Sequence, residues 1–348
     1  MRMRRLANRA IRRAISPFHP NRGAILLYHR IFEPSSDPQL LCVSPLHFAE
    51  HLAHLAENFH VISLLEMVRS ASEGRLQDHS IALTFDDGYA DSFGYAKPLL
   101  ESYNIPATIF VTTGYTGKAN EFWWDELERL VLLSPELPER LILVVKERKV
   151  QWDIGQWCGR LTDEKRTELN RWNVEMSIDP TPRHRAYREL NRLLYHLSPR
   201  ERDMALASLR AQTRNIVPNR PDYRSLSPSE IHEMANHGLL EIGAHTVNHP
   251  VLADLPSEVQ LHEMQNCRST LEEITGQSVR SFAYPFGTES SVSQETFSLV
   301  REIGFEVACA NVPETVTFQP NRYWMPRFLV RDWNADLFSE KLRQFFRA

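Results

Sequence analysis

The chain has 348 residues, of which 42% are hydrophobic and 24% are charged, and its formal net charge is −4. A chain of this length and composition can bury a large core, and its slightly negative charge argues against nucleic acid as a partner. The four cysteines lack the close spacing of a disulfide framework or a thiolate zinc site.

The N-terminal segment is strongly basic, since its first 13 residues contain six arginines and no acidic residue. Apolar residues between these arginines could form one face of a helix. No long apolar run follows, so we expect neither a secretory signal nor a membrane-spanning helix. We predict a basic amphipathic tail over residues 1–20 of a cytoplasmic protein, with residues 1–15 as a candidate contact with a membrane surface. A transit peptide and a solvated tail stay open as alternatives.

Two apolar runs that predict β-strands are followed by side chains able to do chemistry. Residues 24–28 precede His29, and residues 80–85 precede the adjacent carboxylates Asp86 and Asp87. Successive side chains at the end of a strand point in different directions. One carboxylate can therefore hold a metal while its neighbour handles a proton.

The middle of the chain breaks this pattern of strands and helices. Between residues 118 and 225, a helical stripe over 187–197 and a possible hairpin at 141–152 are the main features. We predict a mostly helical insertion over residues 118–225. Its start is rich in aromatic residues, including Trp123 and Trp124.

Two histidines follow the next predicted strand, residues 240–244. His245 and His249 are four positions apart, a spacing that places both imidazoles on one face of a helical turn and lets both reach one cation. With a carboxylate from another strand end they supply two nitrogens and one oxygen, and they leave positions open for water and substrate. The combination predicts a catalytic site for a divalent ion.

Alternation of strands and helices outside the insertion predicts a parallel α/β barrel. Residues 45–58 have the apolar spacing of a helix, and a capping box at Ser227 opens another. Further strands are expected at residues 60–63, 108–112, 281–284, 305–309 and 327–330. The chemically active side chains all follow strands, which places them at the face where barrels of this kind gather catalytic groups.

These motifs resemble those of the polysaccharide deacetylases, carbohydrate esterase family 4, which have a NodB-like homology domain. Residues 85–88 are similar to the family's first motif, residues 245–249 to its second and residues 282–287 to its third. The resemblance implies an irregular (β/α)7 barrel, here with the mostly helical insertion. The barrel would then comprise residues 21–117 and 226–345.

The resemblance also implies roles for individual residues. Asp86 would be the catalytic base, while Asp87, His245 and His249 would hold one divalent metal ion, for which this ligand set favours Zn²⁺. The backbone N–H of Phe286, where the family often has Tyr, would donate a hydrogen bond to the oxyanion.

Other parts of the family pattern are altered. The chain has Ala283 where an arginine that orients the base is common, and either Arg327 or Arg30 could replace it, with Arg327 favoured. The family's later motifs are not evident, so the general acid is sought elsewhere. His29 resembles the histidine of a family branch in which a leading Tyr-His supplies the acid, and His47 is the alternative.

The resemblance implies a hydrolase that removes N-acetyl groups from amino sugars of a polysaccharide or other glycan. Two alternatives stay open. One is the same chemistry on another acyl group or a lipid-linked sugar, and the other is a non-catalytic glycan-binding protein. In a glycan cleft, Trp123 or Trp124 could stack on a sugar ring, whereas the other tryptophans of the insertion are expected to pack it onto the barrel.

Overall fold

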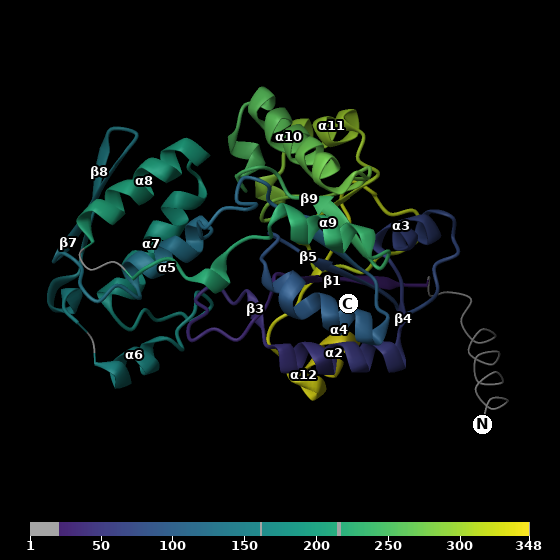
Figure 1. The fold of residues 1–348 in the computed structure, drawn as a ribbon, viewed down its shortest axis with the longest axis horizontal. Coiled ribbons are helices and arrows are strands. Elements are labelled where there is room, and N and C mark those ends of the chain that lie inside the picture. The colour runs from purple at the N-terminus through teal and green to yellow at the C-terminus, as the bar shows by residue number, and fades with distance from the viewer. Residues whose placement is uncertain (1–20, 161, 214–216, 348) are drawn as a thin grey trace.

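The structure is a computed structural model that describes residues 21–160, 162–213 and 217–347. Figure 1 shows a barrel of strands and helices and, beside it, a group of helices with a β-hairpin that the middle of the chain forms. The tail and the membrane contact expected over residues 1–20 lie outside the described residues and stay predictions. None of the described helices is long and apolar enough to cross a membrane.

The main sheet is parallel and follows the order β11-β10-β9-β6-β5-β1-β12, with the short β4 paired to the start of β5. Its strands are β1 (Gly23–Tyr28), β4 (His60–Val61), β5 (Ser80–Phe85), β6 (Ala107–Val111), β9 (Leu240–Ala244), β10 (Ser281–Ala283), β11 (Val307–Cys309) and β12 (Phe328–Leu329). The two ends of this path approach each other, because Cys309 forms a parallel bridge with Met325 just ahead of β12. The predicted irregular α/β barrel is confirmed.

Strands predicted from long apolar runs have the expected limits, whereas the shorter strands at the C-terminal end do not. Strands β5 and β9 match the predicted residues 80–85 and 240–244. Strands β10 and β12 are shorter than expected, and Pro285 follows the first while Pro326 precedes the second. Proline has no N–H to donate to a ladder, so neither strand extends through its proline.

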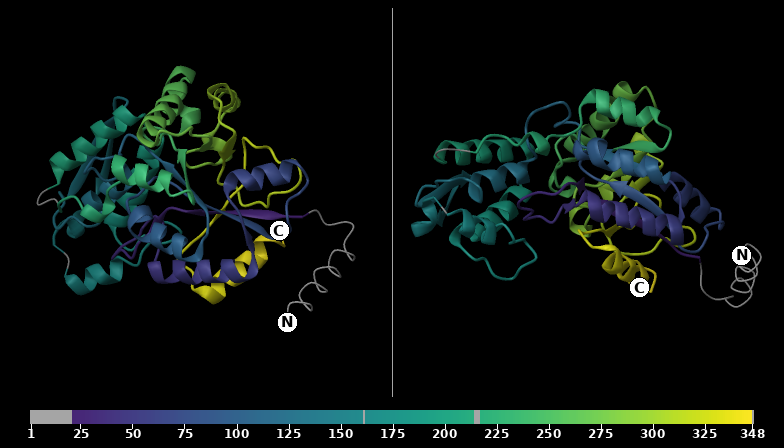
Figure 2. Two further views of the ribbon diagram at one scale, coloured as in Figure 1. Left: turned by 45° about the vertical axis from the view of Figure 1, so that its right-hand side comes forward. Right: turned by 60° about the horizontal axis from the view of Figure 1, so that its bottom comes forward.

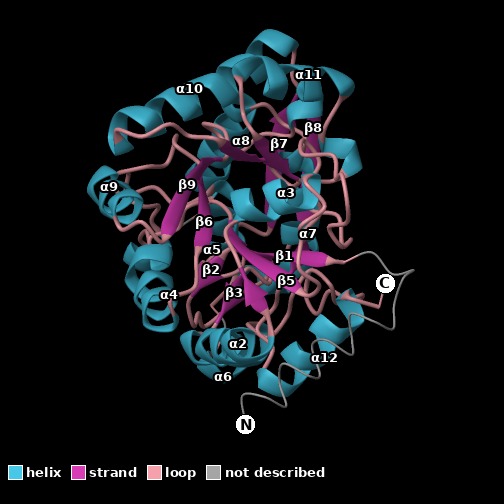
Figure 3. Cartoon of the chain, turned by 90° about the vertical axis from the view of Figure 1, so that its right-hand side faces the viewer, coloured by secondary structure: helices cyan, strands magenta, loops and turns pink. Residues whose placement is uncertain are grey.

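Helices surround the strands (Figure 3). They are α2 (Pro45–Asn58), α3 (Leu64–Ser72), α4 (Lys97–Tyr103), α9 (Pro228–Asn236), α10 (Ser257–Thr275), α11 (Gln294–Ile303) and α12 (Ala335–Phe345). The purple α2 and the yellow α12, from distant parts of the chain, lie side by side in Figure 2. Helix α2 has the predicted limits, since the Ser44 hydroxyl accepts the N–H of His47 and Pro45 occupies the first turn.

A second small sheet begins the loop that follows β1. Its two parallel strands are β2 (Arg30–Ile31) and β3 (Cys42–Val43). The segment between them crosses toward the helices contributed by the middle of the chain (Figure 1).

The middle of the chain leaves the barrel after β6 and returns before β9, and these two strands are neighbours in the sheet. Its elements are α5 (Trp123–Val131), β7 (Arg140–Val145), β8 (Arg148–Asp153), α6 (Asp163–Leu169), α7 (Pro182–Tyr195) and α8 (Pro199–Gln212). They share a hydrophobic core that includes Leu127, Leu141 and Leu190, and Tyr89 of the barrel joins it. We propose on this basis that residues 118–225 form an inserted subdomain.

Candidate active site

The turn after β5 separates the two adjacent carboxylates. Asp87 and Gly88 both adopt left-handed backbone conformations, with φ of 73° and 78°. Such a φ is uncommon for an aspartate, and such strain tends to occur at functional sites. A Cβ atom at Gly88 would lie 3.0 Å from Val111, so only glycine fits there without a shift. The turn directs Asp86 toward Arg327 and Asp87 toward the two histidines.

Asp87, His245 and His249 come together in a buried cluster whose ligand atoms lie within 4.8 Å of one another. Asp87 Oδ1 is 3.6 Å from His245 Nε2 and 3.5 Å from His249 Nε2. Ligands bound tetrahedrally at about 2.0–2.2 Å are separated by about 3.3–3.6 Å, and both distances from Asp87 to the histidines match this spacing. The residues named as ligands from the sequence are therefore close enough to share an ion.

The backbone that carries the two histidines differs from the predicted one. They lie in a loop after β9, so the expectation of a helical turn is wrong. Thr246 and His249 have φ of 64° and 52°, which a helix does not allow. The Thr246 hydroxyl accepts the His249 N–H at 3.0 Å and closes the loop locally. His245 donates from Nδ1 to the carbonyl of Ala283 at 2.7 Å, which leaves its Nε2 lone pair facing Asp87.

Glu263 of α10 holds the same loop from outside the cluster. Its carboxylate accepts the backbone N–H groups of Val247 and Asn248 at 3.0 and 2.8 Å, and the Asn248 side-chain amide at 2.7 Å. Three such bonds to one buried carboxylate fix a backbone that would otherwise have unpaired N–H groups. Nothing in the local sequence indicates this role, because Glu263 lies on an ordinary amphipathic helix.

Asp86 is paired with Arg327, which the sequence favoured over Arg30. Two guanidinium nitrogens donate to the two carboxylate oxygens at 2.7 Å each, and Arg327 also donates to the Thr84 hydroxyl at 3.2 Å and the Ala310 carbonyl at 2.9 Å. Burial raises the pKa of Asp86, but the charges of Arg327 and then His245 outweigh it and hold this pKa below its usual value. Asp86 is therefore ionised at neutral pH.

Arg30 points elsewhere. Its Nε donates to Asp91 at 2.8 Å, and its guanidinium lies over the rings of Tyr89 and Tyr223 at 4.4 and 4.2 Å. Both members of the Arg30–Asp91 pair are buried. This arginine joins the loop after β1 to the barrel and does not contact Asp86.

His29 and Phe286, the other two residues expected in the site, also lie near the cluster. Burial lowers the pKa of His29, and the charges of Asp87 and Asp86 oppose this effect, which places His29 within electrostatic reach of both carboxylates. Phe286 has a left-handed φ of 62°, and its ring packs against His249 at 4.6 Å. Its backbone N–H makes no hydrogen bond within the described residues. His47, the alternative acid, is instead bound to Asp332 at 2.7 Å.

The pKa values of the two histidines shift in opposite directions. Burial opposes protonation of His245, yet the carboxylates of Asp86 and Asp87 raise its pKa above the usual value. Burial and the neighbouring His245 charge lower the pKa of His249 well below the usual value. The cluster thus favours a neutral His249, the form that can donate a lone pair to a cation.

Trp123 and Trp124 are both buried, with 2% and 6% of their surface exposed. Trp124 stacks on Phe122 with centroids 4.8 Å apart, and its ring meets the His249 imidazole edge-on at 5.0 Å. Neither tryptophan presents a free face to a sugar ring. They pack the insertion onto the barrel, as the sequence predicted for the other tryptophans.

A groove of about 370 Å³ lies beside this face of the barrel. Its walls come from the β2–β3 loop, including Glu33, from the turn after α6, including Arg171, and from Arg331 and Asp332. The backbone N–H of Val330 donates to the carbonyl of Leu27, so Arg331 follows β12 close to where His29 follows β1. The charge of Arg331 also acts on the His29 imidazole.

Comparison with known proteins agrees with this geometry. A family model described as polysaccharide deacetylase matches residues 73–132 and 206–308, which contain the carboxylate pair, both histidines and Phe286. Over these two ranges the chain is a match to the polysaccharide deacetylase family. The matched part leaves out most of the insertion, and it also leaves out His29 and Arg327, so these features lie outside what the family model describes.

Among curated polysaccharide deacetylases, the chain is similar to poly-beta-1,6-N-acetyl-D-glucosamine N-deacetylase of Staphylococcus aureus, with 27% identity over 116 residues. This match covers 30% of the chain and 40% of the relative's length. Two solved structures resemble the whole fold: the Streptococcus pyogenes deacetylase PplD in complex with acetate (TM-score 0.57, 17% identity, 93% of this chain and 99% of that chain), and IcaB from Ammonifex degensii (TM-score 0.56, 17% identity, 93% and 97%).

Proposed function

We propose that this chain is a metal-dependent N-deacetylase that releases acetate from an N-acetylated amino sugar of a glycan. The observation that carries the proposal is the buried Asp87–His245–His249 cluster beside an ionised Asp86 that Arg327 holds in place. The similar Staphylococcus aureus protein is named for de-N-acetylation of such a glycan. A divalent ion bound by the three ligands, in our proposal Zn²⁺, supplies a Lewis acid for the amide carbonyl.

Three residues of the chain then transfer protons or stabilise the oxyanion. Asp86 accepts the proton of the attacking water, since its low pKa keeps it ionised and its bidentate bond to Arg327 fixes its orientation. The N–H of Phe286, which has no partner among the described residues, donates to the oxyanion of the tetrahedral intermediate. His29 donates a proton to the leaving nitrogen, so the products are acetate and a free amino sugar.

The groove beside the barrel supports a glycan substrate over a single small acyl compound. It has room for additional sugar units, and both of its walls carry polar side chains that can bond to hydroxyl groups. The barrel provides one wall and the insertion provides the other. We propose that the glycan runs from the catalytic centre into this groove.

Acetate release from defined oligosaccharides tests the proposal. The purified chain is loaded with Zn²⁺ and incubated with N-acetylated oligosaccharides of one to five units, and acetate is measured. We expect turnover that Asp86→Asn lowers by about 10²–10⁴-fold while zinc content stays near one per chain, because this change removes the base and no ligand. His249→Ala should lose both zinc and turnover.

Three outcomes would contradict parts of this assignment. Full zinc occupancy in His249→Ala would remove His249 from the ligand set, and zinc loss in Asp86→Asn would make Asp86 a ligand. No acetate release from any glycan by a zinc-loaded chain would contradict the N-deacetylase activity. Binding of the same glycans without turnover would then favour the non-catalytic alternative.

A further inference from the structure

The two histidines of the cluster are held in different ways. His245 donates from Nδ1 to the Ala283 carbonyl at 2.7 Å. The corresponding Nδ1 of His249 is buried and has no hydrogen-bond partner among the described residues. A histidine that binds a metal usually needs a partner at its second nitrogen to fix the ring. Something other than a hydrogen bond must therefore set the orientation of His249.

Aromatic rings surround His249 in place of that hydrogen bond. Trp124, Phe286 and His245 meet its imidazole edge-on, with centroids 5.0, 4.6 and 4.9 Å away. His249 and Trp124 are both buried, so bulk solvent does not reach this contact. Edge-to-face contacts of this kind have a preferred geometry and hold a ring at a defined angle.

Trp124 is also connected to the segment that carries the third ligand. Its indole Nε1–H donates to the Tyr89 hydroxyl at 2.7 Å, and Tyr89 lies two residues after Asp87. The Tyr89 hydroxyl in turn donates to Asp125 Oδ2 at 2.6 Å. One indole therefore contacts the second-motif loop with its ring and the first-motif segment with its N–H.

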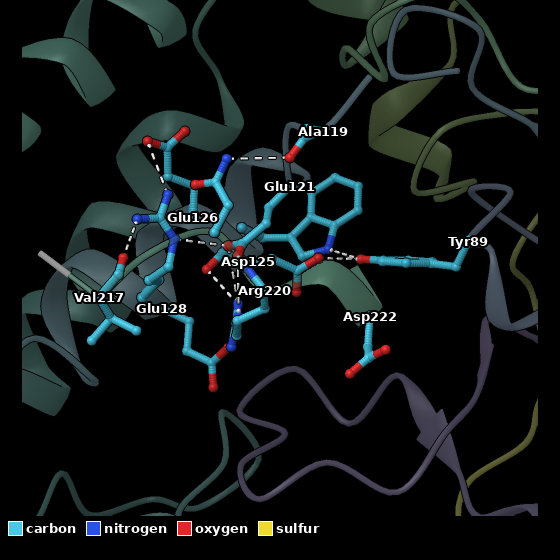
Figure 4. Close-up of polar contacts among 12 residues, drawn as sticks. Tyr89, Ala119, Glu121, Asp125, Glu126, Glu128, Val217, Arg220 and Asp222 are labelled. Atoms are coloured by element: carbon cyan, nitrogen blue, oxygen red, sulfur yellow. Dashed lines mark hydrogen bonds and ion pairs between the residues drawn. The ribbon is translucent and has the colours of Figure 1, made fainter. Parts of the chain in front are cut away.

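A cluster of ionic groups in the insertion fixes Asp125, which accepts the hydrogen bond of the Tyr89 hydroxyl. Arg220 donates to the backbone carbonyl of Asp125 at 2.9 Å and to the carboxylates of Glu121 and Glu128 at 3.2 and 2.6 Å. Figure 4 shows Tyr89 pointing toward Asp125, with Arg220 reaching among the acidic side chains. All of these residues except Tyr89 belong to the insertion. The insertion therefore reaches the metal cluster through Trp124.

We propose that Trp124 is a positioning residue of the metal centre, which fixes the His249 imidazole and links it to the segment that carries Asp87. The proposal rests on the metal site of the proposed function. The indole replaces the hydrogen bond that His249 Nδ1 lacks. It also gives the insertion a role in metal binding that is separate from any contact with substrate.

Zinc affinity measured by chelator competition tests the proposal on the full chain, together with the melting temperature of the zinc-free protein. Trp124→Leu removes the ring and the donor, and we expect about 10–100-fold weaker zinc binding, the loss typical when support of a metal ligand is removed. Trp124→Phe keeps a ring and loses the donor, so its zinc affinity should lie between those of wild type and Trp124→Leu. Trp172→Leu is the matched control, since Trp172 is a buried tryptophan of the insertion that packs on His184 and Tyr187. It should lower the melting temperature without changing zinc affinity.

Substitution of Co²⁺ for zinc gives a second readout that loss of stability alone does not move. The visible absorption of bound Co²⁺ should shift in Trp124→Phe and stay unchanged in Trp172→Leu, because only the first change alters the ligand geometry. Tyr89→Phe, which keeps its ring, should weaken zinc binding less than Trp124→Leu.

Two results would overturn the proposal. One is zinc affinity equal to wild type in Trp124→Leu and Trp124→Phe, and the other is equal loss in Trp172→Leu, which would show a general effect of destabilisation. A wild-type chain that binds no zinc would contradict the metal centre of the proposed function itself. Tight zinc binding by wild type and by both Trp124 variants would contradict only the role of Trp124.

Discussion

The Arg327–Asp86 pair allows a strong test, because both partners are buried and the guanidinium bonds to both carboxylate oxygens at 2.7 Å. Arg327→Met keeps much of the side-chain volume and leaves the Asp86 charge without its partner. Two unit charges about 4 Å apart attract by about 4 kcal/mol at an effective dielectric constant near 20. Removal of one partner of a buried pair costs about 3–5 kcal/mol. We therefore expect the free energy of unfolding of the zinc-free protein to fall by about 3–5 kcal/mol.

Urea unfolding of three variants measures this effect. Asp86→Asn combined with Arg327→Met removes both charges of this pair, so the double variant should be clearly more stable than the losses of the single variants Asp86→Asn and Arg327→Met predict. Arg30→Met serves as the matched control, since it breaks the similarly buried Arg30–Asp91 pair, which does not include the base. It should lower stability without altering the pH dependence of deacetylation.

Deacetylation should respond to Arg327→Met in its pH profile. Arg327 helps to hold the pKa of Asp86 below its usual value, and the pair's contribution to stability is lost as pH falls through that folded-state pKa. Without the guanidinium, burial raises the pKa of Asp86, so the acidic limb of kcat/KM should move to higher pH. A loss of stability below 1 kcal/mol, strictly additive variants, or an acidic limb that moves equally in Arg30→Met would refute the reasoning.

Three further predictions concern residues around the site. His29→Ala should keep zinc and most activity on an aryl acetate ester, whose leaving group needs no proton, while it loses N-deacetylation; equal loss on both substrates would remove His29 as the acid. Burial raises the pKa of Asp125 to about 8, so the folded state keeps a proton that the unfolded state releases above about pH 4. The unfolding free energy of wild type should therefore fall by up to about 3 kcal/mol relative to Asp125→Asn between pH 5 and 7.5, and parallel urea curves across this range would contradict it. Glu33→Ala combined with Arg171→Ala should lower kcat/KM for five-unit chains about tenfold and leave single-sugar turnover unchanged; no dependence on chain length would remove the groove as a binding site.

Local patterns in the sequence were sufficient for the elements that local interactions determine. Strand β5, strand β9 and helix α2 have the predicted limits, because continuous apolar runs and a Ser44–Pro45 cap do not depend on distant residues. The gathering of chemically active side chains at the C-terminal ends of the strands likewise follows from the parallel topology.

Features that depend on distant contacts could not be predicted in the same way. The spacing of His245 and His249 suggested a helical turn, but the loop relies on left-handed residues and on Glu263 from another element. The choice between Arg327 and Arg30 depended on which carboxylate each one meets across the barrel. From the sequence, Trp124 could have stacked on a sugar ring. Its burial against His249 depends on how the insertion packs on the barrel, which local sequence does not show.

The position of the insertion has a consequence for how the protein folds. Strands β6 and β9 pair directly, yet the residues they align are about 130 positions apart in the chain, and closing so long a loop has an entropic cost. An insertion that folds early would shorten the effective loop and bring the ends of both strands near each other. Asp87 precedes β6 and His245 follows β9. The ability to hold a metal should therefore arise late in refolding, after the inserted segment has become compact.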